Sequence, residues 1–241
     1  MSFWKHAGET LAVMLRRFRE EHSLCDDEKL TYAGRLDPMA EGIVPILVGE
    51  ARFQKDHLLG KAKTYEVDIV LGLSTDTGDL LGLLINENLS ARKFLAEIQK
   101  AVETLSELKE LAYPNYSSRP VEGKPLFMHA RAGNKVTLPV KKITIHELEL
   151  LGIKEVALCA LLGNAQEIIA KVQGDFRQAE IMAQWRKMME ADGDKQITIV
   201  TIRTTVSSGT YMRSLAEKMG ELLGVPALAG RIVRTNLEGM E

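Results

Sequence analysis

The chain has 241 residues, 45% of them apolar, which is enough for one large domain or two small ones with a hydrophobic core. No apolar run approaches the roughly 20 residues that span a bilayer, and the first residues lack the apolar core of a secretory signal, so we expect a cytoplasmic protein that does not contact a membrane. The 31 lysines and arginines against 33 aspartates and glutamates give a net charge of −2, so composition alone does not indicate a nucleic-acid partner.

The cysteines and histidines do not have the spacing of a metal centre. Cys25 and Cys159 form no Cys-x-x-Cys pair, and we expect two buried thiols rather than a disulfide or a zinc site. His57, His129 and His146 are scattered along the chain without a His-x-x-x-His spacing. No metal and no cofactor are therefore predicted.

The first third of the chain predicts a helix, a shaped loop and a strand, in that order. Residues 9–21 place apolar side chains on one face of an amphipathic helix. Glycine and proline punctuate residues 31–50 too often for one long regular element, so a loop with short flanking elements is expected. Residues 64–72 alternate apolar and polar side chains and end at a glycine, as a strand does. The turn at 76–79 lacks the later ligands of an EF-hand, which favours a structural turn.

The middle of the chain predicts a further helix and two more strands. Ser90 is expected to cap a helix with apolar residues at helical spacing. A polar, proline-bearing loop follows at 113–124. Strand-like alternation returns at 142–150 and again at 196–206.

A long helical stretch separates these two strands. Residues 164–191 carry apolar side chains at helical positions, with Gly174 interrupting or bending the stretch, and 214–223 predict a last helix. Strands interspersed with helices, without regular β-α-β alternation, predict an α+β fold with a mainly antiparallel mixed sheet flanked by helices and loops. Neither an internal repeat nor a low-complexity linker is present, so 1–241 are expected to form one domain.

Asp37 is a candidate for chemistry on local grounds, but an ambiguous one. It lies between Leu36 and Pro38 in a glycine-flanked turn. Functional loops held by a scaffold often have this character. An aspartate that caps backbone N–H groups in a turn has it too.

The sequence around Asp37 resembles a known signature. Residues 34–45, GRLDPMAEGIVP, are similar to the G-x-L-D-P-x-A-x-G-x-L-P motif of TruB-type pseudouridine synthases. Further resemblances follow in the family's order: KTY at 63–65, LGLSTDTGD at 71–79, YSS at 116–118 with GKPL at 123–126 and AR at 130–131, SGTYMRSLA at 208–216, and LAGRIVRT at 228–235. Together they span almost the whole chain.

The resemblance implies an RNA-modifying isomerase with the pseudouridine synthase fold. Such an enzyme converts a uridine of folded RNA to pseudouridine without a cofactor, and the usual substrate of the bacterial-type family is the T-loop of tRNA. It further implies that Asp37 is the catalytic carboxylate, that Tyr65 stacks on the flipped base or moves a proton, and that Arg213 pairs with Asp37 and keeps it ionised. Whether the aspartate attacks the sugar, attacks the base or abstracts a proton stays open.

The RNA contacts that the resemblance and the charge pattern imply are more widely spread. They are Tyr32, Arg35, Lys63, Arg119, Lys124, Arg131, Tyr211, Ile232 and Arg234. Lys61, Lys141, Lys142 and Arg231 extend the candidate basic patch, although solvated surface charges would look the same. Three positions depart from the family pattern: Tyr32 replaces a histidine, Phe127 replaces a tyrosine, and Ile232-Val233-Arg234 replaces Leu-Arg-Arg.

Residues 153–195 look longer than the corresponding link in the family and predict a helical insertion. The chain ends at Glu241, just after the catalytic pattern, so the small C-terminal RNA-binding (PUA-like) domain of many relatives is expected to be missing. Contacts from 153–195, a protein partner, or a short stem-loop substrate would then have to provide RNA affinity. We expect a monomer.

Two other functions stay open on the sequence. One is an RNA-binding or tRNA-folding protein that uses the same pocket without catalysis. The other is a glycoside or nucleoside hydrolase that combines Asp37 with a second carboxylate such as Glu41 or Asp76.

Overall fold

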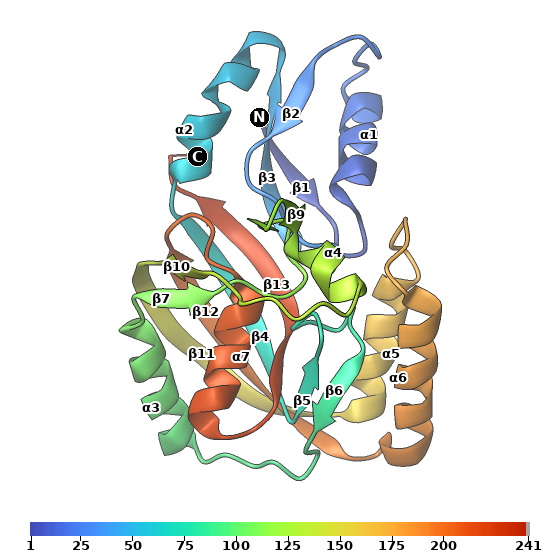
Figure 1. Ribbon diagram of the computed structural model, residues 1–241, viewed down its shortest axis with the longest axis vertical. Coiled ribbons are helices and arrows are strands. Elements are labelled where there is room, and N and C mark those ends of the chain that lie inside the picture. The colour runs from blue at the N-terminus through green and yellow to red at the C-terminus, as the bar shows by residue number, and fades with distance from the viewer. Residues whose placement is uncertain (240–241) are drawn as a thin grey trace.

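The computed structural model describes residues 1–239, and a seven-stranded sheet forms its centre (Figure 1). The strand order is β1-β3-β13-β4-β12-β11, with β2 paired to β3. Only β13 and β3 run parallel, so the sheet is mixed and mainly antiparallel, which confirms the predicted α+β fold. The strands of this sheet are β1 (Ser2–Lys5), β2 (Leu30–Tyr32), β3 (Glu41–Val48), β4 (Lys63–Leu71), β11 (Ile145–Ala157), β12 (Gln196–Val206) and β13 (Ala227–Leu237).

Helices pack in front of the sheet, at one side of it and beside the strands at its top. In Figure 1, α3 and α7 lie in front of the sheet, α5 and α6 form a pair at one side, and α1 and α2 lie beside β1–β3 at the top. The helices are α1 (Leu11–Glu21), α2 (Lys55–Gly60) after the 3₁₀ helix η1 (Gly49–Gln54), α3 (Leu95–Ser106), α4 (Leu126–Arg131), α5 (Leu158–Ile169), α6 (Gln178–Asp192) and α7 (Met212–Leu223). Short hairpins are made by β5 (Leu73–Thr75) with β6 (Leu84–Glu87), β7 (Glu110–Ala112) with β10 (Val140–Lys142), and β8 (Pro120–Val121) with β9 (Lys124–Pro125).

Two hydrophobic clusters hold these layers together. The larger one joins α1, α3 and α7 to the sheet and includes Phe18, Ile202 and Met219. The second lies between the α5–α6 pair, the sheet and the turn after β5. Its largest member, Trp185, is fully buried, and its indole N–H donates to the carbonyl of Leu80 at 3.0 Å. Truncating a buried side chain of this size costs about 3–5 kcal/mol, so α5 and α6 are firmly attached to the core.

Several predicted helices and strands are confirmed, but the predicted N-cap of one helix is wrong. The predicted 9–21 helix is α1, which Thr10 caps by accepting from the Val13 N–H at 3.4 Å. The strands predicted at 64–72 and 196–206 are β4 and β12. Ser90 does not cap α3, because Phe94 is the N-cap and Glu97 accepts from its backbone N–H at 2.9 Å.

The stretch 31–50 is more regular than its glycines and prolines predict. Residues 41–48 form β3. Gly42 does not end this strand; it allows the backbone of β3 to approach that of β13 closely. Its φ is +121°, and a Cβ there would lie 2.3 Å from the Arg234 carbonyl oxygen of β13. Only glycine fits such a close approach.

The remaining differences concern lengths and burial. The strand predicted at 142–150 runs to Ala157 as β11, and the single bent helix predicted over 164–191 is two helices separated by 170–177. Strand β13 was not predicted. Both cysteines are exposed, so the expectation of buried thiols is wrong. No helix within residues 1–239 has the length and apolar character needed to cross a membrane.

Candidate functional site

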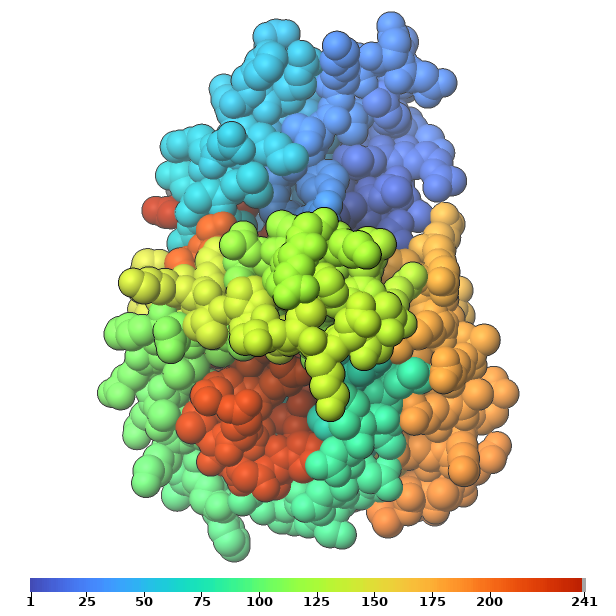
Figure 2. Space-filling view, in the orientation of Figure 1, coloured from blue at the N-terminus to red at the C-terminus, as the bar shows by residue number. Residues whose placement is uncertain are grey.

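Segments from the whole length of the chain surround one cavity of about 630 Å³. In Figure 2 the segment 113–142 lies across the front of the molecule, between the N-terminal segments and α7. The cavity is lined by the Asp37 loop, the start of β4, the turn at 77–81, residues 116–118, α4, residues 175–177, the segment 208–213 and the end of β13. This convergence places Asp37, Tyr65 and Arg213 in one site.

The loop that carries Asp37 is held from beneath by a buried lysine. Lys5 of β1 is fully buried, and its ammonium group donates to the carbonyls of Ala40 at 2.6 Å and Pro38 at 3.2 Å. Desolvation lowers the pKa of Lys5 to about 8. A lysine near a chain terminus looks like a surface charge in the sequence, so its role was not predicted.

We expect Lys5→Met to destabilise the protein and to slow its reaction. The change leaves the carbonyl of Ala40 without its donor, which costs about 1–3 kcal/mol, and loosens the Asp37 loop. The carbonyl of Pro38 still accepts from the Gly8 N–H at 2.9 Å. Urea denaturation should show that loss, and turnover should fall roughly tenfold because the carboxylate is misplaced. Lys29→Met, at an exposed lysine, is the control. Equal stability of the two variants would contradict the anchoring role of Lys5.

Arg213 fixes the carboxylate of Asp37. Its Nε donates to Asp37 Oδ2 at 2.8 Å, Nη1 to the carbonyl of Thr77 at 2.6 Å, and Nη2 to the carbonyl of Tyr116 at 3.1 Å. The arginine side chain is 4% exposed and the aspartate side chain 36% exposed. The pair therefore presents the carboxyl group of Asp37 to the cavity from a buried arginine that three hydrogen bonds hold in place.

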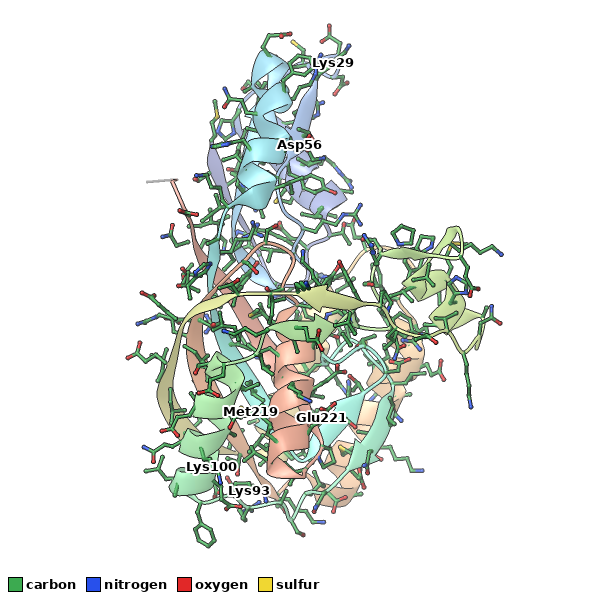
Figure 3. The ribbon with its side chains drawn as sticks, turned by 60° about the vertical axis from the view of Figure 1, so that its left-hand side comes forward. Lys29, Asp56, Lys93, Lys100, Met219 and Glu221 are labelled. Carbon is green, nitrogen blue, oxygen red and sulfur yellow. The ribbon has the colours of Figure 1, made fainter. Side chains whose placement is uncertain are left out.

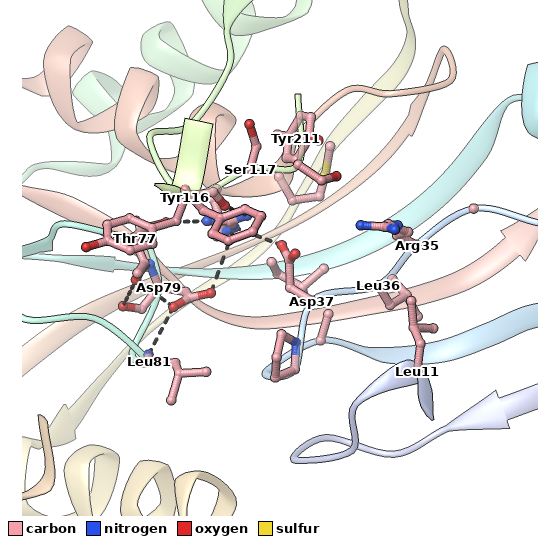
Figure 4. Close-up of a pocket in the computed structure, with 18 of the residues that line it drawn as sticks. Leu11, Arg35, Leu36, Asp37, Thr77, Asp79, Leu81, Tyr116, Ser117 and Tyr211 are labelled. Carbon is pink, nitrogen blue, oxygen red and sulfur yellow. Dashed lines mark hydrogen bonds and ion pairs between the residues drawn. The ribbon is translucent and has the colours of Figure 1, made fainter. Parts of the chain in front are cut away.

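A second carboxylate, Asp79, lies on the other side of Arg213. Its Oδ2 is 3.8 Å from Arg213 Nε, and its Oδ1 accepts from the Thr77 hydroxyl at 2.8 Å and the Leu81 N–H at 2.9 Å. Burial raises the pKa of Asp79 to about 6. Figure 4 shows Asp37 and Asp79 below Tyr116 and Tyr211 in this view. The sequence predicted only a structural turn here and missed the contact with Arg213.

Tyr65 belongs both to the core and to the cavity wall. It lies on β4 opposite Thr204 of β12 and Arg234 of β13, and it is 7% exposed. Burial raises the pKa of its hydroxyl. Its ring lines the same cavity as Asp37.

Comparisons with known proteins agree with this geometry. The sequence profile of the TruB family pseudouridylate synthase N-terminal domain matches residues 22–163, more than half of the chain. The chain belongs to the TruB family. Among curated relatives, tRNA pseudouridine synthase B of Bacillus anthracis is 33% identical over 210 residues, and that of Geobacillus thermodenitrificans is 32% identical over 212 residues. These alignments cover 87% and 86% of this chain but 57% of each relative, so the chain spans little more than half the relatives' length.

Solved structures show the same fold at lower identity. A Cbf5-Nop10-Gar1 complex matches with a TM-score of 0.57 and 18% identity, over 97% of this chain and 47% of that one. An H/ACA RNP bound to a substrate RNA containing 2′-deoxyuridine matches with a TM-score of 0.55 and 18% identity, over 97% and 45%. At this identity the likeness concerns the fold.

The structure gathers most of the RNA-contact residues predicted from the TruB resemblance, but not all. Arg35, Lys63, Arg131, Tyr211, Ile232 and Arg234 line the cavity, whereas Tyr32, Arg119 and Lys124 do not. Arg119 lies over the ring of Tyr113 at 5.5 Å, and that ring packs edge-on against Tyr211. Arg119 is therefore near the rim. Tyr32 instead contacts Lys55, whose Nζ is 5.6 Å from the ring centroid.

Two of these cations line the cavity from buried positions. Arg234 is fully buried, and its guanidinium donates to the carbonyls of Ile43 at 2.6 Å and Gly34 at 3.2 Å. Lys63 is 4% exposed and donates to the carbonyl of Lys61 at 2.7 Å, and burial together with Arg234 lowers its pKa to about 8. Both lie on central strands of the sheet, where backbone carbonyls accept from their donors.

The second carboxylates named for a hydrolase do not line the cavity. Glu41 pairs with Arg231 at 3.1 Å, and Asp76 pairs with Arg177 at 2.6 Å. Among residues 1–239, no cluster of three or more histidine, cysteine, aspartate or glutamate side chains is arranged to hold a metal ion.

Glu217 of α7, near Asp79, is a further carboxyl group whose pKa is shifted. We expect Glu217→Gln to change how the stability of the protein depends on pH. Desolvation raises the pKa of Glu217 from 4.5 to about 7, so the folded protein keeps this proton while the unfolded chain loses it. Wild-type stability should therefore fall as pH rises between these values. The glutamine variant lacks this fall and should be more stable above pH 7, by at most about 3 kcal/mol and less because the carboxyl is partly exposed.

Urea denaturation at pH 4.5 and at about pH 8 measures the difference between variant and wild type. Asp79 is present in both proteins, so the comparison reports the carboxyl group of Glu217 together with its repulsion from Asp79. Glu103→Gln, at an exposed position of α3, serves as a control with a small effect. A stability difference that does not change with pH would contradict the burial of an ionisable Glu217.

Proposed function

We propose that this protein is a pseudouridine synthase that isomerises uridine in folded RNA, with the T-loop of tRNA as its substrate. The observation that carries the proposal is the ion pair of Asp37 and Arg213, which presents a fixed carboxylate to a cavity beside Tyr65 in a chain of the TruB family. The name of the relatives, tRNA pseudouridine synthase B, supports tRNA as the substrate class.

The chemistry suits one ionised carboxylate. Isomerisation breaks the bond between the base nitrogen and the sugar, rotates the base, and joins its C5 to the same sugar carbon. Positive character develops at that carbon, and a carboxylate stabilises it as nucleophile or as neighbouring charge. Asp37 suits either role, because Arg213 fixes the orientation of its carboxyl group and the cavity leaves that group partly exposed to a substrate.

The cavity suits a flipped nucleotide. A uridine in a folded loop must leave its stack before its sugar can be reached. The cavity volume of about 630 Å³ lies in the usual range of small-ligand pockets, roughly 300–1,000 Å³. The ring of Tyr65 and the side chain of Ile232 give it apolar surface for a base, and Arg35 and Arg131 add exposed cations.

RNA affinity then depends on local charges, because the net charge of the sequence is −2. We propose that residues 1–241 act as the catalytic domain and that α5 and α6 are its family-atypical insertion. A protein partner, of the kind seen in the Cbf5-Nop10-Gar1 complex, is one route to stronger RNA binding. Affinity for a tRNA transcript should fall steeply with salt concentration, since phosphate contacts release counterions.

The test is to incubate the purified protein with a tRNA transcript and separate the nucleosides of the digested product by chromatography. Pseudouridine should form in the wild-type transcript and be absent from one in which the T-loop uridine is replaced by cytidine. Pseudouridine at another position would support the proposed isomerase activity but would show that the target uridine is not the one in the T-loop. Absence of pseudouridine on a panel of folded RNAs, beside an active control enzyme, would refute the isomerase.

A further inference from the structure

The connection between α5 and α6, residues 170–177, reaches the candidate active site from a distant part of the chain. Asp175, Phe176 and Arg177 line the cavity that contains Asp37. In Figure 1 this connection extends from the top of the helix pair toward α4. Because Trp185 anchors α6 in the core, the connection has a rigid base.

Arg177 makes two contacts that cross between segments. Its Nη1 and Nη2 donate to the two carboxylate oxygens of Asp76, at 2.6 Å and 3.1 Å. Its guanidinium carbon also lies 4.7 Å from the centroid of the Tyr116 ring. The planar arginine head group suits this combination, because it binds a carboxylate with two parallel hydrogen bonds while stacking on an aromatic face.

These two contacts adjoin the two carbonyls that hold Arg213. Asp76 precedes Thr77, whose carbonyl accepts from Arg213 Nη1, and Tyr116 itself provides the carbonyl that accepts from Nη2. The Asp76 carboxylate is tied down in turn by the Leu83 N–H at 2.8 Å. Arg177 thus joins the turn at 76–79 to the segment at 116–118, on which the orientation of Arg213 depends.

The backbone of Arg177 supports a specific need for its side chain. Its φ and ψ are +61° and +27°, in the left-handed region that disfavours residues with a Cβ. Glycine would adopt this conformation without strain. Strained residues persist where the surrounding structure demands them, and they concentrate at functional sites.

The neighbouring ion pair is a weaker link. Arg131 of α4 reaches Asp175 with an Nη1–Oδ2 distance of 3.4 Å, and the two side chains are 40% and 82% exposed. Exposed pairs of this kind contribute little. The Arg177–Asp76 pair is shorter, bidentate and about one-fifth exposed on both sides.

We propose that Arg177 is a positioning residue for the catalytic ion pair, through which the α5–α6 helices orient Arg213 and hence Asp37. The inference rests on the proposed isomerase activity. It assigns to the helical pair a role in the site itself, in addition to any contact with RNA.

Arg177→Gly tests this role, because it removes the side chain and relieves the backbone strain at once. We expect kcat to fall on the order of tenfold to a hundredfold with KM nearly unchanged, since misplacement of a reacting group costs about that much. Asp76→Asn should reproduce most of the loss, and the double variant should be little worse than either single one. Arg177→Lys, which keeps the charge without the planar fork, should recover part of kcat. Arg186→Ala, at an exposed arginine of α6, is the matched control.

A rise in KM with unchanged kcat would show that Arg177 contacts RNA directly and would overturn the positioning role. Additive effects of Arg177→Gly and Asp76→Asn would overturn it as well. If wild-type protein forms no pseudouridine, the proposed function fails, and the positioning role is then decided by ¹⁵N NMR of the Arg213 Nε–H. That signal should shift and exchange faster in Arg177→Gly than in Arg186→Ala. An unchanged signal would refute the inference.

Discussion

Replacing Asp37 by asparagine should abolish uridine isomerisation while leaving the RNA bound. Asparagine keeps the shape of the side chain and an oxygen that accepts from Arg213 Nε, so the loop and the cavity should persist. It cannot act as an anionic nucleophile or base. Loss of such a group in other enzymes lowers turnover on the order of 10⁴-fold or more, and we expect a comparable loss here.

Binding and turnover are measured on the same protein for this prediction. RNA affinity at fixed salt should equal or slightly exceed that of the wild type, because one negative charge is removed from the site. Asp56→Asn, on the exposed face of α2 in the part of the molecule that projects at the top of Figure 3, should behave like the wild type. The RNA binding curve of Asp37→Asn confirms that this variant is folded. Turnover by Asp37→Asn within tenfold of the Asp56→Asn control would refute the catalytic role.

Replacing Arg213 by lysine should have the second largest effect. Lysine keeps the positive charge but cannot donate in the three fixed directions that Arg213 uses toward Asp37, Thr77 and Tyr116. At least one buried carbonyl loses its donor, and the carboxylate loses its orientation. We expect kcat to fall on the order of 10²- to 10³-fold, in line with loss of a well-placed charged group.

The stability of Arg213→Lys should fall by about 1–3 kcal/mol for the unpaired carbonyl. Arg203→Lys is the matched control, because Arg203 of β12 is exposed and pairs with Glu66 at 2.8 Å outside the cavity. Single-turnover kinetics of the two variants isolate the chemical step. If both lysine variants retain the wild-type rate, the claim that the guanidinium geometry of Arg213 orients Asp37 for catalysis is refuted.

The sequence could predict those parts of the site that lie within ordered motifs. Arg213 lies 176 residues after Asp37, yet the resemblance implied their pairing, and the two side chains meet at 2.8 Å. The strand that carries Tyr65 was predicted from its alternation. The catalytic roles of the three residues stay predictions, because geometry alone does not test turnover.

The parts that could not be predicted depend on burial and on partners far apart in the chain. Lys5 has no local signal, since its partners are carbonyls of another segment. Asp79 has the sequence of a turn and becomes notable through its burial beside Arg213. Arg177 lies in a stretch outside the family's motifs, and its contacts with Asp76 and Tyr116 exist only once α5 and α6 are folded against the core.

Burial also changes how two predicted RNA contacts are to be interpreted. Lys63 and Arg234 were predicted to contact RNA because cations near a motif suggest phosphate binding. Their positions on the adjacent strands β4 and β13 place them inside the protein, where backbone carbonyls use their donors. A pattern of residue types shows that a cation is present, and only the packing shows what it faces.

The most direct test of the central claim follows the hydrogen on C5 of the target uridine. Bonding C5 to the sugar carbon expels that hydrogen, whereas base hydrolysis and simple binding leave it in place. With a tRNA transcript labelled with tritium at C5, wild-type protein should release label into water in step with pseudouridine formation, while Asp37→Asn should release none. Release of free uracil, or equal release of tritium by both proteins, would contradict an isomerase that works through Asp37.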